Sequence, residues 1–173
     1  MFHELICHPD TPSGAVDGID VAIARPQPGV LALRYTVSGR IAEVSLAPPS
    51  APLRAGELWR TTCFEAFVET AQGAGYYEFN LSPSSKWAAY HFTSYRDGMA
   101  LAELSPPAII TGANVTHIDV DALIYLPPTE GLWRLALAAV IEETNGVKSY
   151  WALKHPPGKP DFHHADAFVV ELA

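Results

Sequence analysis

Residues 132–153 read LWRLALAAVIEETNGVKSYWAL, and this stretch decides the fold class. Its first half is rich in alanine and leucine, which favour a helix. Four apolar residues in it also alternate with the period of a strand: Leu135, Leu137, Ala139 and Ile141. Asn145-Gly146 follows, and this pair is favoured in two-residue hairpin turns. Helix and hairpin both stay open for this segment, and we favour the hairpin because of its turn.

Short segments typical of strands recur on both sides of this stretch. Residues 31–37, 63–69, 76–81 and 115–126 alternate in the same way. Residues 41–46 follow a turn at residues 38–40, residues 87–92 are aromatic and β-prone, and residues 167–172 are expected to form the closing strand. Fifteen prolines and twelve glycines are spread from end to end, and they leave few windows for a long helix. The pattern predicts an all-β fold: one antiparallel β-sandwich of jelly-roll type that spans residues 1–173 as a single domain.

The composition excludes several classes of protein. With 49% hydrophobic and 17% charged residues, the chain is not of the disordered type. Its longest apolar run, residues 135–141, is too short to span a bilayer, so no membrane is expected as a partner. The formal net charge is -8 and the basic residues are scattered singly, so no nucleic acid is expected either.

The beginning of the chain and the cysteines predict the location. Residues 1–10 carry no basic leader followed by a long apolar stretch, which is the pattern of a secretory signal. Cys7 and Cys63 are far apart and have no zinc-type spacing. We therefore expect a cytoplasmic protein with free thiols. The sequence leaves its oligomeric state open.

Local catalytic and metal-binding motifs are absent from the sequence. It has no G-x-S-x-G elbow and no phosphate-binding loop. His3 and His8 are five residues apart, which places them on different sides of a helix and excludes a zinc-protease motif. Residues 155–166 hold three histidines and two aspartates that could bind a divalent ion. Their prolines favour a stiff loop with capping side chains, and we expect no metal site there.

Aromatic and polar side chains are concentrated in residues 58–65 and 76–87. Flat rings beside carboxylates and amides are typical of sugar sites, because rings stack on the faces of a pyranose and polar groups bind its hydroxyls. Trp59 follows a loop rich in proline and glycine, where it either contacts a ligand or anchors the loop. Glu65 and Glu78 lie between apolar neighbours and point either to solvent or, beside Asn80, into a polar concavity.

Several of these motifs, taken in order, resemble a known family. They are Trp59, the E-x-F motif at residues 65–67, the Y-x-F-N-x-S-P motif at residues 77–83, and the terminal segment 161–172. In this order they resemble the DOMON-like proteins related to family 9 carbohydrate-binding modules, with a likeness from about Leu31 onward. The resemblance implies a jelly-roll β-sandwich and, as in the sugar binders of that family, two aromatic rings that clamp a terminal sugar.

The resemblance also implies roles for single residues. Trp59 resembles one wall of the clamp, and Glu65 resembles a carboxylate that binds hydroxyls. Asn80 stands where the sugar binders have an arginine, so the sugar specificity stays open. Phe162 is the nearest aromatic to the position of the second wall, and a slip of one residue would place Asp161 or His163 there.

The cofactors of the family have weak counterparts in this chain. The candidate calcium ligands are Asp17, Asp20, Asp161 and Asp166. Some DOMON domains bind haem through methionine and histidine, but Met99 has no evident imidazole partner in the sequence. We predict no resident cofactor; calcium stays open and haem is not expected.

The sequence therefore predicts a non-catalytic domain that binds a saccharide or a similar small polyol. Lys154 and His155 join the site because they begin the loop expected to face Trp59. The predicted ligand-binding residues are Trp59, Glu65, Glu78, Asn80, Lys154, His155, Asp161, Phe162 and His163. One alternative is an enzyme in which Glu65 or Glu78 works with His155 or His163 as acid and base. Another is a protein-interaction module.

Overall fold

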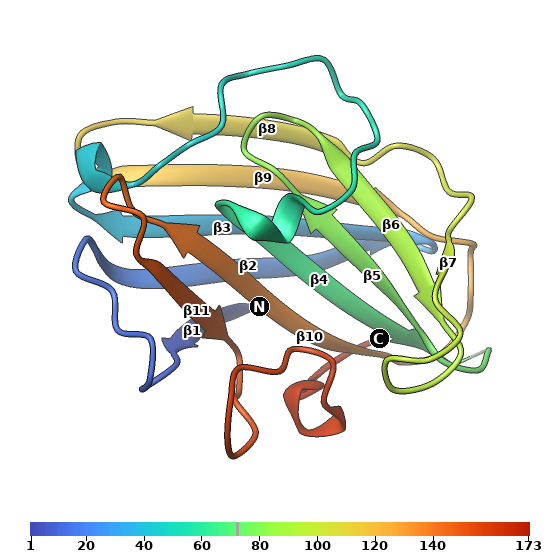
Figure 1. Ribbon diagram of the computed structural model, residues 1–173. Coiled ribbons are helices and arrows are strands. Elements are labelled where there is room, and N and C mark those ends of the chain that lie inside the picture. The colour runs from blue at the N-terminus through green and yellow to red at the C-terminus, as the bar shows by residue number, and fades with distance from the viewer. Residues whose placement is uncertain (72) are drawn as a thin grey trace.

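The computed structural model describes residues 1–71 and 73–173, and in this part of the chain twelve strands form one sheet (Figure 1). The strands are β1 (Phe2–Cys7), β2 (Val16–Gln27), β3 (Val30–Gly39), β4 (Cys63–Thr70), β5 (Tyr76–Leu81), β6 (Trp87–Phe92), β7 (Ala100–Leu101), β8 (Ala108–Ala113), β9 (His117–Tyr125), β10 (Trp133–Glu142), β11 (Lys148–Ala152) and β12 (Val170–Leu172). The helical elements of the described residues are three 3-10 turns: η1 (Ile41–Glu43), η2 (Leu58–Arg60) and η3 (Ala165–Ala167).

The sheet curls so that its two halves form two layers. Its order is β7-β6-β5-β4-β10-β11-β1-β2-β3-β9-β8, with β12 also beside β10, and these strands pair antiparallel. Strand β1 joins the halves, because Phe2–Leu5 pair with β2 while Ile6 and Cys7 pair with β11. We call β2, β3, β8 and β9 the β3 layer, and β4–β7 with β10–β12 the β4 layer. Figure 1 shows the strands of the two layers crossing at an angle.

The core lies between the layers and follows the two-residue period of the strands. Alternate residues of the β3 layer are buried, among them Leu31, Leu33, Tyr35 and Val37 on β3. The β4 layer contributes alternate residues to the same cluster, among them Phe64, Ala66, Val68, Leu135, Leu137, Ala139 and Ile141. The side chains of the residues that alternate with these along each strand therefore face away from this core, on the outer side of each layer.

The antiparallel all-β class is confirmed, and so is the hairpin interpretation of residues 132–153. β10 and β11 pair along their length, from the pair Ala138–Ala152 to the pair Glu142–Lys148. Gly146, with a φ of 86°, occupies the turn between them. The predicted strand at residues 41–46 is wrong. There the chain forms η1, and only Val44 makes an isolated bridge, with Glu143. The jelly-roll topology stays a prediction.

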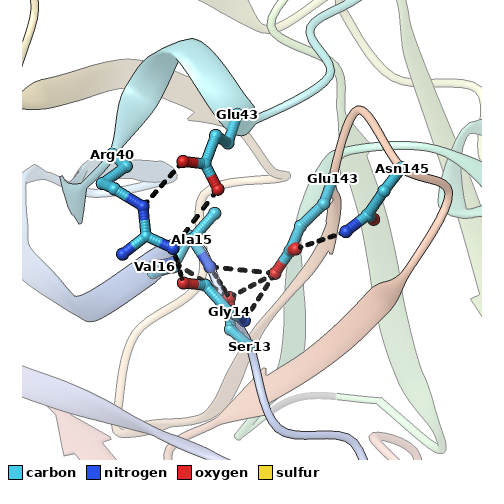
Figure 2. Close-up of polar contacts among 8 residues, drawn as sticks. All are labelled: Ser13, Gly14, Ala15, Val16, Arg40, Glu43, Glu143 and Asn145. Atoms are coloured by element: carbon cyan, nitrogen blue, oxygen red, sulfur yellow. Dashed lines mark hydrogen bonds and ion pairs between the residues drawn. The ribbon is translucent and has the colours of Figure 1, made fainter.

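The buried carboxylate of Glu143 connects the loop between β1 and β2 to the β10–β11 hairpin. Figure 2 shows Glu143 Oε1 accepting hydrogen bonds from the Ser13 hydroxyl at 2.9 Å and from the backbone N–H groups of Gly14 at 2.7 Å and Ala15 at 3.1 Å. Asn145 Nδ2 donates to its other oxygen at 3.4 Å. Burial alone would raise the pKa of Glu143, but these donors outweigh it and hold the pKa below its usual value.

Two further observations concern the cysteines and membranes. Cys7 and Cys63 are both free thiols. In the described part of the chain no helix has the length and apolar character needed to cross a bilayer.

Candidate functional site

The outer face of the β4 layer carries the polar residues that the sequence singled out. On β4, Phe64, Ala66 and Val68 enter the core, and Cys63, Glu65 and Phe67 point to the other face, as the alternation predicts. Because Glu65 pairs with Asn80 and Phe67 pairs with Glu78, the side chains of both glutamates lie on that outer face.

A concavity of about 590 Å³ opens on this outer face, and we call it the Glu65 concavity. Strands supply its floor, and the loops before β4, after β6 and after β11 supply its walls. Its lining residues are Gly56, Glu57, Trp59, Glu65, Glu78, Tyr90, Phe92, Arg96, Met99, Val140, Tyr150, Pro160, Phe162 and His163. Five of the nine residues predicted for the ligand site thus meet in one place: Trp59, Glu65, Glu78, Phe162 and His163.

The floor holds two carboxyl groups with different surroundings. Glu65 is 4% exposed, and among the described residues its carboxylate has no hydrogen-bond partner. Glu78 is 7% exposed and accepts a hydrogen bond of 2.6 Å from Asn80 Nδ2. Asn80 is buried and does not line the concavity; it acts on the site by holding Glu78.

Burial raises the pKa of both carboxyl groups. For Glu65, burial is the largest cause and the nearby charge of Glu78 adds to it, against the opposing field of Arg96, so its pKa lies well above the usual value. For Glu78, burial again comes first, but the hydrogen bond from Asn80 and the charge of Arg96 limit the rise. Glu65 is therefore the carboxyl group that most lacks a partner for its charge.

His163 reaches the floor from the loop after β11. Its Nδ1 lies 2.7 Å from the hydroxyl of Tyr76, and its Nε2 lies 3.6 Å from Glu78 Oε2. The backbone N–H of Arg96 donates to the Tyr76 hydroxyl at 3.2 Å, so we assign the hydroxyl proton to His163 Nδ1 and the ring proton to Nε2. Burial and the charge of Arg96 lower the pKa of His163 to about 4, although Asp161 opposes them. At neutral pH the contact with Glu78 therefore involves a neutral imidazole.

Asp161 holds one wall of the site without lining it. Its carboxylate accepts a hydrogen bond from Arg96 Nη2 at 2.7 Å, another from Tyr95 Oη at 2.5 Å, and a third from the backbone N–H of His163 at 3.2 Å. These donors hold its pKa below the usual value, although burial acts in the opposite direction. Asp161 thus links the loop after β6 to the loop after β11.

Trp59 lies in η2, and Figure 1 shows this helical turn on the outer side of β4. Glu57 adopts a φ of 57° before the turn, Arg60 pairs with Glu57 at 2.7 Å, and Lys148 Nζ donates to the carbonyl of Arg60. These contacts hold the backbone on both sides of Trp59, while its indole stays 49% exposed. A held backbone with an exposed ring is typical of a contact residue.

Phe162 lines the concavity from the loop after β11. Its ring centroid lies 6.2 Å from that of Tyr150 on β11 and 6.4 Å from that of His155. Tyr150 itself lines the concavity next to it. Trp59 and Phe162 come from loops about 100 positions apart in the chain and line the same concavity.

Two predicted residues line a different hollow. Lys154 and His155 lie with His8, Asp10 and Asp166 around a hollow of about 730 Å³ beside β1. His155 Nε2 lies 2.8 Å from the carbonyl of Ile6, and its ring contacts that of His8 edge-on at 4.8 Å. In the loop after β11, the residues that line the Glu65 concavity begin at Pro160.

The comparisons with known proteins bear on the fold. No known protein family matches the chain, and no curated protein matches it. Two solved structures resemble it over nearly its whole length. One is a protein from Bacteroides uniformis ATCC 8492 with a provisional assignment as carbohydrate-binding, at 15% identity and a TM-score of 0.70, covering 97% of this chain and 84% of that one.

The other structure is a family 9 carbohydrate-binding module from Caldicellulosiruptor kristjanssonii in complex with cellotriose. It is 7% identical, has a TM-score of 0.67, and covers 99% of this chain and 80% of the other. The chain shares the fold of a family 9 carbohydrate-binding module. The expected resemblance to these modules is thereby confirmed for the fold, whereas the DOMON-like part of it stays a prediction.

Several residues that line the concavity were not predicted from the sequence. Tyr90 pairs with Glu78 across β5 and β6, so its place on the outer face follows from the alternation along residues 87–92. Tyr150 pairs with Val140 in the predicted hairpin and could have been placed in the same way. Arg96 and Met99 lie in an irregular loop, where no periodic signal exists to place them.

The candidate calcium ligands do not meet in the structure. No three histidine, cysteine, aspartate or glutamate residues gather as a metal site within residues 1–71 and 73–173. Asp161 binds Arg96 and Tyr95, and Asp166 lies 3.9 Å from His164. The expectation about cofactors stays a prediction.

Proposed function

We propose that this protein binds a saccharide in the Glu65 concavity, with Trp59 and Phe162 stacking on the sugar. The observation that carries the proposal is that one exposed indole and one phenyl ring from distant loops line the same concavity as two buried carboxyl groups. Rings remove the apolar faces of a pyranose from water, and buried polar groups bind its hydroxyls. The volume of about 590 Å³ suits a small ligand, and the fold likeness to a sugar-binding module supports the same class.

The polar groups of the floor match the requirements of hydroxyl recognition. Within residues 1–71 and 73–173 no group donates to the Glu65 carboxyl group, which lines the concavity, so a ligand hydroxyl would give this group a hydrogen-bond partner. Glu78 and His163 are already oriented by Asn80 and Tyr76, respectively. A preformed set of this kind lowers the cost of ordering side chains on binding. We propose that the protein binds its ligand without catalysis. We propose the cytoplasm as its location, as expected from the sequence.

Intrinsic fluorescence tests this proposal, because Trp59 is exposed while Trp87, Trp133 and Trp151 are buried. Titration with glucose, cellobiose and cellotriose is expected to shift the emission and to protect Trp59 from acrylamide. Trp59→Ala is expected to abolish the sugar-dependent change and to weaken binding at least about tenfold, the scale of a lost aromatic contact. Phe2→Ala removes an exposed ring on β1 and serves as the matched control. Equal binding by both variants would refute the proposed site.

A second candidate function is glycoside hydrolysis, favoured by the pair of buried carboxyl groups on one floor. Glu65 and Glu78 are diagonal neighbours on β4 and β5, and the pKa of each is raised by burial, as a general acid requires. A panel of chromogenic glycosides tests it. Turnover that Glu65→Gln abolishes would establish the enzyme, and sugar binding without turnover would reject it.

A further inference from the structure

We infer that the Glu65 concavity selects a sugar that carries a free ammonium group, such as a hexosamine, over its neutral and N-acetylated counterparts. This inference rests on the proposed function, because it names the class of saccharide that the same site takes. It follows from the balance of charges around the floor and from the kind of side chains that form the walls.

The floor carries two acidic groups, Glu65 and Glu78. The third lining glutamate, Glu57, belongs to the wall before β4 and pairs with Arg60 at 2.7 Å. Among the lining residues of the described chain, the one permanent cation is Arg96, and its guanidinium is bound to Asp161 at 2.7 Å. His163 is neutral at pH 7 because its pKa is about 4. Among the described lining residues the permanent cation is therefore already paired, although its field still reaches Glu65.

Glu65 is the group that this imbalance leaves without a partner. It is buried and lines the concavity, and within residues 1–71 and 73–173 no side chain or backbone group donates to its carboxylate. A neutral sugar hydroxyl can donate one hydrogen bond to it. An ammonium group donates a hydrogen bond in which both partners are charged, and its positive charge stabilises the ionised form of the buried carboxyl group, which a neutral hydroxyl does not do.

The walls favour a cation for an independent reason. Tyr90, Tyr150 and Phe162 line the concavity, and the faces of aromatic rings attract cations within about 6 Å. The ring of Trp59 already has the guanidinium carbon of Arg60 5.4 Å from its centroid. Met99 adds a polarizable thioether. Rings around buried carboxyl groups provide apolar contact for the carbon faces of a pyranose and a negative environment for its ammonium group. A sugar carboxylate or phosphate would instead meet Glu57, Glu65 and Glu78.

The test is calorimetry on the full chain with matched ligands: glucosamine, N-acetylglucosamine, glucose and glucuronic acid, followed by the fully deacetylated and the N-acetylated forms of chitobiose. At pH 6.5 the deacetylated sugars are expected to bind at least about tenfold more tightly than their N-acetylated forms, and glucuronic acid is expected to bind most weakly. Repeating the titration in two buffers of different ionisation enthalpy reports the proton that Glu65 releases when the ammonium group binds.

The groups that face Glu65 define the variants. Glu78 lies beside it on β5, His163 and Arg96 approach from the loops, Glu57 lies near η2, and Tyr90 and Tyr150 lie on β6 and β11. Glu65→Gln keeps the shape of the side chain and is expected to remove the preference for deacetylated sugars and the proton release. Glu171→Gln, an exposed change on β12, is expected to alter neither.

The outcomes separate this inference from the proposed function. Equal affinity for all four monosaccharides and for both dimers overturns the preference and leaves sugar binding standing. Binding of glucosamine that Glu65→Gln does not weaken overturns the role of Glu65. Tetramethylammonium is titrated as a cation that is not a sugar. Its binding without affinity for any sugar overturns the proposed function, and absence of all binding overturns both the proposed function and the preference for ammonium sugars.

Discussion

The hydroxyl of Tyr35 donates a hydrogen bond of 2.9 Å to the backbone carbonyl of Glu65. Tyr35 belongs to β3 in the opposite layer, so this bond crosses the core and ends on the residue that forms the floor of the site. The rings of Tyr35 and Phe64 also contact each other, with centroids 4.9 Å apart. The position of Glu65 is thereby set from behind by the core as well as by the pairing of β4.

Tyr35→Phe is expected to lower the free energy of unfolding by about 1–2 kcal/mol, because it removes the donor of a fully buried hydrogen bond and keeps the ring. Urea unfolding at pH 7 measures the change. Tyr125→Phe is the control, since that tyrosine lies partly exposed on β9. A Tyr35→Phe protein as stable as the Tyr125→Phe protein would contradict the structural role of this bond.

His163 is expected to titrate near pH 4 by NMR, far below the usual value of about 6.5. Burial is the main cause and the charge of Arg96 is the second, so Arg96→Gln is expected to move the midpoint upward. Because the folded-state pKa is the lower one, the unfolded chain binds the proton more readily between these two values. His163 therefore costs the protein stability as the pH falls from about 6.5 to 4. A midpoint near 6.5 in the folded protein would contradict this environment.

The strands could be predicted wherever one face of the layer is buried, because burial of one face imposes the period of two. This holds for β3, β4, β5 and β6, and for the hairpin at Asn145-Gly146. It also holds for β2, a strand that was not predicted although Ile19, Val21 and Ile23 alternate in the core. The strand predicted at residues 41–46 was wrong because the buried residues there, Ile41 and Val44, are three positions apart, which is the spacing of a 3-10 turn.

The candidate site divides in the same way. Glu65 and Glu78 could be placed because strand periodicity determines their face, and Trp59 stood out as a large ring in a loop. Lys154 and His155 could not be placed, because the path of an irregular loop depends on contacts far away in sequence, such as that between His155 and Ile6. Arg96 could not be placed either, because it is held by a hydrogen bond to Asp161, which lies 65 positions away in the sequence.

The two thiols are expected to react at different rates with Ellman's reagent. Cys63 is buried, and burial together with the nearby charge of Glu65 raises its pKa well above the usual value. Cys7 is half-buried. Burial raises the pKa of its thiol above the usual value, and a hydrogen bond from the backbone of Ser13 limits the rise. The native protein is expected to show one slowly reacting thiol and a second that reacts only after unfolding. Cys7→Ser identifies the first of them, and rapid reaction of two thiols in the native protein would disprove the burial of Cys63.

Gly75→Ala is expected to be strongly destabilising, by about 2 kcal/mol or more, because the position combines a φ of 82° with a close approach of backbone. A Cβ there would lie 1.8 Å from the carbonyl oxygen of Phe92, on the strand next to β5. Gly112→Ala is the matched control, since a Cβ at that position on β8 meets nothing within 4 Å. Thermal unfolding of both variants measures the difference. Equal melting temperatures would contradict the close packing of this turn.

Glu143→Gln is expected to lower the free energy of unfolding at pH 7 by about 1–3 kcal/mol, because an amide replaces the charge that three donors around Oε1 stabilise. The pKa of Glu143 is lower in the folded protein than in the unfolded chain. Its contribution is therefore complete above the unfolded-state pKa of about 4.3 and is lost as the pH falls through the folded-state pKa. The difference in stability between the wild-type and Glu143→Gln proteins should shrink below pH 4.3 and be constant above pH 6. Urea unfolding from pH 7 to pH 3.5 measures it, with Glu171→Gln, exposed on β12, as the control. A difference independent of pH would mean that the loop at Ser13 is held by the shape of the side chain at 143 and not by its charge.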